Sequence, residues 1–173
     1  MITNDNQLIF VSITEEMKEN ARKTSKEYQD NLNNSIRSGE GTLAGCLGEE
    51  MFQKVFPFMV RTNTFEYDFT YENLTFDVKT KERTVEPKLF YDCSVNTMNG
   101  KQNVDHYVFA QVLDSYDYGW LLGTMKSSKF FDRATLHPEG SRDENNGFTF
   151  HCDTYNIPIK ELRAITPPEG WQS

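Results

Sequence analysis

The chain has 173 residues, of which 37% are hydrophobic and 13% aromatic, and this composition indicates a folded protein with the size of one domain. Its formal net charge of −8 argues against a strong general DNA binder, because such binding depends on cationic contacts to phosphate, but less against an enzyme whose acids surround bound cations. The three cysteines show no C-x-x-C pair and no zinc spacing, and no apolar stretch approaches membrane-spanning length, so we expect a soluble, cytoplasmic protein with reduced thiols and no membrane contact.

The N-terminal part of the chain predicts a short strand followed by a long helix. Residues 8–11 form an apolar run, and Ser12 with Glu15 three residues later resembles a capping box. Apolar residues then recur mostly at four-residue intervals between positions 13 and 36, which predicts an amphipathic helix over that segment.

A second helix is expected from Leu43 to about Phe56, with Thr42 as its N-terminal cap. The neighbouring acids Glu49 and Glu50 fall on different faces of this helix. Glu50 is expected to form an exposed pair with Lys54, one helical turn later.

Glu49 lies on an otherwise apolar face, where an unpaired carboxylate is costly to bury. Two interpretations follow: the edge of the helix leaves Glu49 half exposed, or Glu49 points toward a cation that acids elsewhere in the chain also bind. In the second case, Gly45 and Gly48 would let the helix approach a sheet closely.

Residues 65–82 predict a β-hairpin that turns at residues 72–73, because apolar and polar residues alternate on both sides of that pair. A two-residue loop places Asp68 directly opposite Asp77, and Lys79 projects from the same face as Asp77. Because opposed like charges destabilise a sheet, the two acids either both face water or bind a cation such as Mg²⁺ or Mn²⁺. A lysine beside such a cation would stabilise charge on a reacting phosphate.

The stretch from Arg83 to Asn103 is polar and predicts a loop. Lys81, Arg83 and Lys88 make its start locally basic, which gives the best candidate for a phosphate-contacting surface in the chain. A solvated loop explains the same charges equally well.

The remainder predicts a strand hairpin, a short helix, a loop, another strand and a short helix or turn, in that order: residues 105–113 with 118–125, 127–136, 137–147, 148–155 and 157–165. Gln111 is expected near the end of the first of these strands. There it would either orient a ligand or simply be a polar residue at the edge of the sheet.

Along the chain, an acid in a helix is followed by an acid in a hairpin strand and then by Asp-x-Lys in the next strand. This is the order found in the PD-(D/E)xK nuclease superfamily. The chain resembles that family through Gly-Cys-Leu-Gly-Glu at 45–49, Tyr-Asp at 67–68 and Asp-Val-Lys at 77–79, with tyrosine where the family name has proline. The match covers residues 42–81, and the later strands agree with it in order. In its small size, the chain resembles phage-encoded or repair-type members of this superfamily.

The resemblance implies an α/β, restriction-endonuclease-like fold, in which a mixed β-sheet is flanked by helices. We therefore expect a single nuclease-like domain over residues 1–173. It would consist of a helical lead-in over 1–41, a core over 42–165 and a tail over 166–173.

The resemblance also implies hydrolysis of phosphodiester bonds in nucleic acid, with DNA as the expected substrate. Mg²⁺ or Mn²⁺ would be held by Asp68, Asp77, the Val78 carbonyl oxygen and Glu49. The ion would lower the pKa of a bound water and polarise the phosphate, while Lys79 would position that water or stabilise the phosphoryl charge. Lys81, Arg83, Lys88 and Gln111 are the candidate substrate-binding residues.

Two other classes of function stay open from the sequence. One is a catalytically silent protein of the same fold, acting as a binding module, an inhibitor or an assembly subunit, which the acidic charge would suit. The other is a nuclease that acts on RNA. A homodimer or a larger assembly is compatible with each of them.

Overall fold

The structure is a computed structural model, and it describes residues 8–31, 40–62, 64, 66–98 and 101–166. Within these residues a six-stranded sheet has the strand order β1-β7-β6-β4-β3-β2, and a three-stranded sheet has the order β5-β9-β8. The elements in chain order are β1 (Ile9–Ser12), α1 (Glu15–Asn31), α2 (Glu40–Val55), β2 (Val60–Arg61), β3 (Phe69–Tyr71), β4 (Leu74–Arg83), β5 (Asp92–Asn96), β6 (His106–Leu113), β7 (Tyr118–Lys126), α3 (Ser127–Arg133), β8 (Thr135–His137), β9 (Thr154–Pro158) and the short 3₁₀ helix η2 (Ile159–Glu161).

The large sheet is mixed. Strands β4 and β6 run parallel, whereas its other paired strands run antiparallel. The parallel pair aligns Asp77 with Tyr107 and Lys79 with Phe109. The expectation of an α/β fold with a mixed sheet is confirmed.

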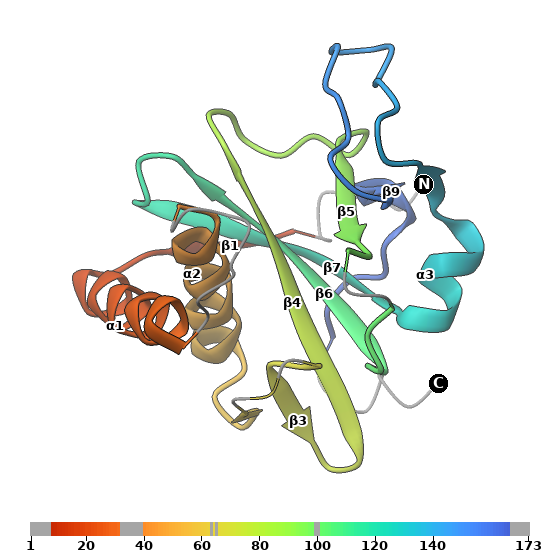
Figure 1. Cartoon of the computed structure of the whole chain (residues 1–173). Helices are drawn as coiled ribbons and strands as arrows, with labels where there is room; N and C mark the ends of the chain where they lie inside the picture. Colours follow the sequence, from red (N-terminus) through yellow and green to blue (C-terminus); the bar gives the residue numbers. More distant parts are fainter. Residues whose placement is uncertain (1–7, 32–39, 63, 65, 99–100, 167–173) are drawn as a thin grey trace, which may run out of the picture.

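Two hydrophobic cores lie on opposite faces of this sheet. Helices α1 and α2 cover one face, while β5, β9 and α3 lie on the other (Figure 1). Strand β6 is buried along its whole length and alternates between the two cores, with Val108 and Ala110 on the side of the helices and Tyr107 and Phe109 on the side of the small sheet. No helix among the described residues is long and apolar enough to cross a membrane.

The hairpin that carries the candidate acids forms in the register expected from the sequence. Phe69 pairs with Phe76 and Tyr71 with Leu74, so the loop is the two residues 72–73. Glu72 has φ of 50°, in the left-handed region that tight two-residue hairpin loops require. Strand β3 begins at Phe69, which places Asp68 just before it.

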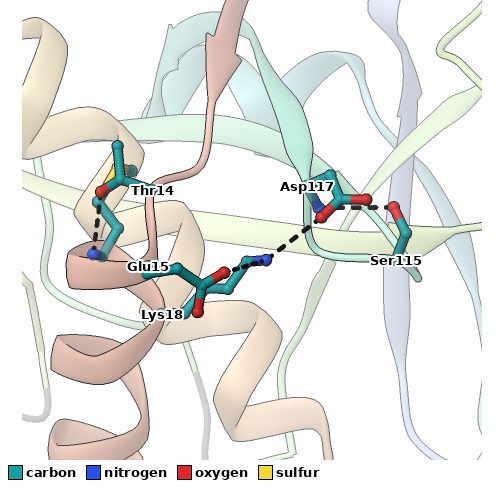
Figure 2. Close-up of polar contacts among 6 residues, drawn as sticks. Thr14, Glu15, Lys18, Ser115 and Asp117 are labelled. Atoms are coloured by element: carbon teal, nitrogen blue, oxygen red, sulfur yellow. Dashed lines mark hydrogen bonds and ion pairs between the residues drawn. The ribbon is translucent and has the colours of Figure 1, made fainter.

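The start of α1 differs from the expected capping box. The Met17 N–H donates to the Thr14 side-chain oxygen at 3.2 Å, so Thr14 caps the helix, whereas Ser12 belongs to β1. Lys18, one turn into α1, bonds Asp117 in the turn between β6 and β7 at 3.2 Å (Figure 2). The cap prediction was wrong because the chain stays extended through Ser12.

Other predicted boundaries also need correction. The helix expected from Leu43, with Thr42 as its cap, already begins at Glu40, so Thr42 lies within it. The predicted last turn of the first helix falls among residues outside the described part of the chain. The segment predicted as a loop after Arg83 contains β5, which pairs with β9.

The strand expected over 148–155 instead lies at Thr154–Pro158. The helix expected over 127–136 ends at Arg133, after which the chain enters β8. Where a helix or turn was expected over 157–165, the chain completes β9 and forms only the short η2 helix. Residue 166 is the last one described, so the expected tail lies almost wholly outside the described residues.

Candidate functional site

Helix α2 approaches strand β4 most closely at Gly48. A Cβ atom built on Gly48 would lie 1.9 Å from the Thr80 hydroxyl oxygen, so only glycine fits there without a shift. A Cβ atom on Gly45 would meet nothing within 4 Å, so the expectation that Gly45 also permits the approach was wrong. The contact at Gly48 sets Glu49, the next residue, against the sheet.

Glu49 is buried, with 8% of its surface exposed, which favours the interpretation that it points inward over the half-exposed alternative. Burial raises the pKa of Glu49 to about 7. The Arg61 guanidinium opposes that rise in pKa, and the negative charge of Asp77 adds to it. The helix acid and the β4 acid are therefore close enough to repel each other.

The neighbouring acid Glu50 does not form the exposed pair expected from the sequence. Its carboxylate accepts from Arg61 Nη1 at 2.7 Å, and its side chain is only 11% exposed. Lys54 instead donates to the Ser12 carbonyl oxygen at 2.9 Å. Arg61 lies on β2, so the spacing of residues along the helix could not predict its pair with Glu50.

Asp68 is tied to β4 by two hydrogen bonds. Its N–H donates to the Phe76 carbonyl oxygen at 2.9 Å, and its Oδ2 accepts from the Val78 N–H at 2.8 Å. Burial raises the pKa of Asp68 well above its ordinary value, and the charges of Asp77 and Glu49 raise it further, whereas the bond from Val78 lowers it. Asp68 therefore shares one electrostatic environment with both other candidate acids.

Asp77 is the most enclosed of the three acids, with 4% of its surface exposed. Lys79 Nζ lies 2.7 Å from Asp77 Oδ2, and Gln102 Nε2 donates to Asp77 Oδ1 at 3.0 Å. Lys79 Nζ also lies 5.9 Å from the centre of the Tyr107 ring, whose pKa is raised by burial and by Asp77. The sequence offered no signal for Gln102, which comes from the segment before β6.

The structure thus brings together the catalytic residues predicted from the sequence. Glu49 comes from α2, Asp68 from the residue before β3, and Asp77 and Lys79 from β4. Val78 takes part through its N–H, which donates to Asp68, whereas the sequence predicted its carbonyl oxygen as a metal ligand.

The predicted basic surface has a different part in the structure. Lys81 Nζ and Arg83 Nη2 donate to the Asp92 carbonyl oxygen at 2.9 and 3.2 Å, and the Arg83 guanidinium lies 4.8 Å from the Tyr91 ring centre. These two cations fasten β5 to β4. Lys88 is exposed and lies 5.9 Å from the Phe90 ring centre.

Gln111 is central and buried, with 1% of its surface exposed, so its expected place at the sheet edge was wrong. Its Nε2 donates to the Val85 carbonyl oxygen at 2.7 Å, and its Oε1 has no hydrogen-bond partner among the described residues. With Lys79, Lys81 and Arg83 it lines a gap of about 290 Å³, partly open to solvent, beside β5. Three of the four predicted substrate-binding residues therefore share one pocket with Lys79.

The donor set has the chemistry that Mg²⁺ or Mn²⁺ prefers, since carboxylate and carbonyl oxygens are hard ligands. Among the described residues, no group of three or more His, Cys, Asp or Glu side chains is placed so that it could hold a metal ion. Mg²⁺ is commonly bound through one or two carboxylates, with waters and substrate phosphate completing its shell. Asp68 and Asp77 fit that open type of site.

No protein-family model matches the chain, and no curated protein matches it either.

Proposed function

We propose that the protein is a divalent-metal-dependent nuclease with a restriction-endonuclease-like fold, acting on phosphodiester bonds in DNA. The observation that carries this proposal is that the charges of three acids from separate elements, Glu49, Asp68 and Asp77, act on one another, with Lys79 paired to Asp77. The mixed sheet, with α2 against β4 and a parallel partner strand after the Asp-Val-Lys segment, supports the fold assignment.

The electrostatics of the acids support a cation as the missing partner. Burial raises the pKa values of Glu49 and Asp68, and mutual repulsion with Asp77 contributes to both shifts. Lys79 and Arg61 are the cations that act on these acids, and Arg61 already pairs with Glu50, so the two positive charges do not balance the carboxylates when all are ionised. A divalent cation, when bound, would remove that repulsion and supply a water of lowered pKa.

Residues of the chain would then hold the carboxylates in position and stabilise charge on the substrate phosphate. Asp77 is fixed by Gln102, and Asp68 by the Val78 N–H, so both carboxylates are held in place before any ligand arrives. Lys79 is 30% exposed and therefore accessible to a substrate phosphate, whose developing charge it would stabilise.

The test is cleavage of supercoiled and linear DNA with Mg²⁺, with Mn²⁺ and with EDTA. We expect cutting with either metal and none with EDTA. Lys79→Ala should abolish cutting while leaving the thermal unfolding temperature close to that of the wild type. Lys160→Ala is the matched control, because Lys160 is an exposed lysine on η2, outside the site, and its loss should leave cutting intact. Robust cutting in EDTA, or full activity in Lys79→Ala, would contradict the proposal.

A silent binding protein of the same fold is the second candidate. One observation favours it: both carboxylate oxygens of Asp77 are already engaged, by Lys79 and by Gln102. An RNA oligonucleotide panel under the same conditions separates the remaining possibilities. Cutting of RNA alone identifies an RNA nuclease, and cutting of neither nucleic acid favours the binding protein.

A further inference from the structure

A second pocket lies at the other end of the β6–β7 pair and does not include the candidate acids. It offers about 80 Å³ of space to water-sized molecules and is partly open to solvent. Its ionisable lining comes from the start of β6, the end of β7, α3, η2 and the segment after η2: His106, Lys126, Lys129, Arg133, Glu161 and Arg163. Four cationic side chains thus meet one carboxylate, in a protein whose formal net charge is −8.

His106 gives this pocket a buried polar group without a protein partner. The residue is 4% exposed and stacks on Phe76, with ring centres 5.2 Å apart and an interplanar angle of 16°. Its Nε2 atom is buried and has no hydrogen-bond partner among the described residues. Burial lowers the pKa of His106, the positive charges of Lys126 and Arg163 lower it further, and the negative charge of Asp105 only partly opposes them, so the ring is neutral at pH 7. A buried ring nitrogen of this kind is normally paired, which points to a partner that a ligand supplies.

The positive charge of the pocket is only partly balanced from within. Arg133 Nη2 lies 2.6 Å from Glu161 Oε2, so the single carboxylate of the lining is taken up by one arginine. Lys129 and Arg163 are exposed, and Lys126 is half-buried beside His106, its partner across the β6–β7 ladder. By count, the lining therefore carries more cationic than anionic side chains.

We propose that this pocket binds a phosphate group. Phosphate carries up to two negative charges and several acceptor oxygens in a tetrahedral arrangement, so it can use donors from β7, α3 and the segment after η2 together. Lysine binds phosphate as a point charge and arginine through paired N–H groups, and both kinds of donor line the cavity.

The source of the phosphate follows from the position of the pocket, and this step rests on the proposed nuclease function. His106 is paired with Phe76, the residue before Asp77, and Lys126 is paired with His106. At about 5 Å per strand, the pocket begins one to two strands away from Asp77, with His106 on the face of β6 opposite to that of Tyr107, the residue aligned with Asp77. A nucleic-acid strand whose scissile phosphate lies at the acids would place a nearby phosphate, internal or terminal, at this pocket.

The first experiment tests the phosphate site without reference to cleavage. Inorganic phosphate is titrated into isotopically labelled protein in EDTA at pH 7.5, and the imidazole signals of His106 and the amide signals of residues 124–133 are followed by NMR. We expect saturable shifts confined to these signals, and about tenfold weaker binding in Lys126→Ala and in Lys129→Ala, the effect of losing one charge-assisted hydrogen bond. Lys160→Ala removes an equal charge outside the pocket and should leave the affinity unchanged. Shifts scattered over the surface, or equal weakening by Lys160→Ala, would overturn the site.

The second experiment identifies the source. A labelled twelve-nucleotide single strand, with either a 5′-phosphate or a 5′-hydroxyl, is bound in EDTA and measured by fluorescence anisotropy. A preference for the 5′-phosphate that disappears in Lys129→Ala indicates a terminal phosphate. Equal binding of both strands, with a salt slope reduced by about one in Lys129→Ala, indicates an internal phosphate. Binding that ignores both lysine substitutions overturns the assignment to nucleic acid.

Because EDTA prevents metal-dependent cutting, these results separate the two proposals. A protein that binds phosphate in the pocket and cuts nothing leaves this inference standing without the nuclease. A protein that cuts DNA while Lys126→Ala and Lys129→Ala bind phosphate as the wild type does leaves the nuclease standing without this inference.

Discussion

The Val78 N–H donates to Asp68 Oδ2 at 2.8 Å, which ties the carboxylate before β3 to the middle of β4. The same carboxylate feels the negative charges of Asp77 and Glu49. Against this repulsion Asp68 has the bond from the Val78 N–H and the more distant charge of Lys79, whereas Asp77 has a direct ion pair with Lys79.

This contrast predicts opposite effects for two similar substitutions. Asp68→Asn keeps an oxygen that accepts from Val78 and removes a repelled charge, so the metal-free protein should gain up to about 1 kcal/mol in its free energy of unfolding. Asp77→Asn removes the partner of Lys79 and should not show that gain. Urea unfolding in EDTA at pH 8.5 measures both. A less stable Asp68→Asn would mean that the charge of Asp68 is needed for its bond to Val78.

The approach of α2 to β4 predicts a sharp difference between two glycines of one helix. Gly48→Ala places a Cβ atom against the Thr80 hydroxyl and should cost about 1–3 kcal/mol, as overpacking does. Gly45→Ala is the matched control: it meets nothing within 4 Å and should be neutral or stabilising by up to about 1 kcal/mol. Thermal unfolding compares the two, and combining Gly48→Ala with Thr80→Ala should restore part of the loss. Equal effects at both glycines would mean that α2 does not touch β4 at Gly48.

The ion pair between Glu50 and Arg61 predicts a measurable coupling. Glu50→Gln should destabilise the protein by about 1–2 kcal/mol, because it removes the charge paired with Arg61 Nη1, while Arg61 Nε and Nη2 are already buried without a hydrogen-bond partner among the described residues. A double-mutant cycle between Glu50 and Arg61 should show coupling, whereas one between Glu50 and Lys54 should give nearly zero. Coupling between Glu50 and Lys54, with none between Glu50 and Arg61, would contradict this prediction and support the helical pair expected from the sequence.

The burial of His106 predicts a loss of stability in mild acid. Its pKa in the folded protein lies below the ordinary 6.5, so the unfolded chain binds a proton more readily. The contribution of His106 is therefore fully present above pH 6.5 and is lost as the pH falls toward the folded-state pKa. His106→Phe keeps a ring to stack on Phe76 but removes the titration. Denaturant unfolding between pH 7.5 and pH 5 should show a steeper decline in the wild type than in the variant, and parallel declines would contradict the prediction.

The local geometry of the candidate site could be predicted from the sequence because it depends on short-range periodicity. The two-residue period and the turn at 72–73 fix the register of the hairpin, and with it the facing of Asp68 and Asp77. The helical period likewise places Glu49 on the buried face.

The other contacts of the candidate site join segments that lie far apart along the chain, and a single sequence carries no signal for such contacts. Gln102 and Arg61 reach the acids only after β2 and β6 have joined the sheet. Strand β5 is only five residues long and mixes polar with buried residues, so its pairing with β9, about 60 residues later, leaves no pattern stronger than that of a loop. The lysine and arginine assigned to phosphate at positions 81 and 83 are used to hold that strand.

The parallel pairing of β4 with β6 has a consequence for the order in which the protein folds. The hairpin of β3 and β4 closes over two residues, an event of microseconds, whereas Phe76 must find His106 thirty residues along the chain. Asp68 and Asp77 are thus brought face to face before Gln102 is delivered to Asp77. We therefore expect the repulsion between Asp68 and Asp77 to be present in the hairpin while β4 pairs with β6, and to slow that step of folding.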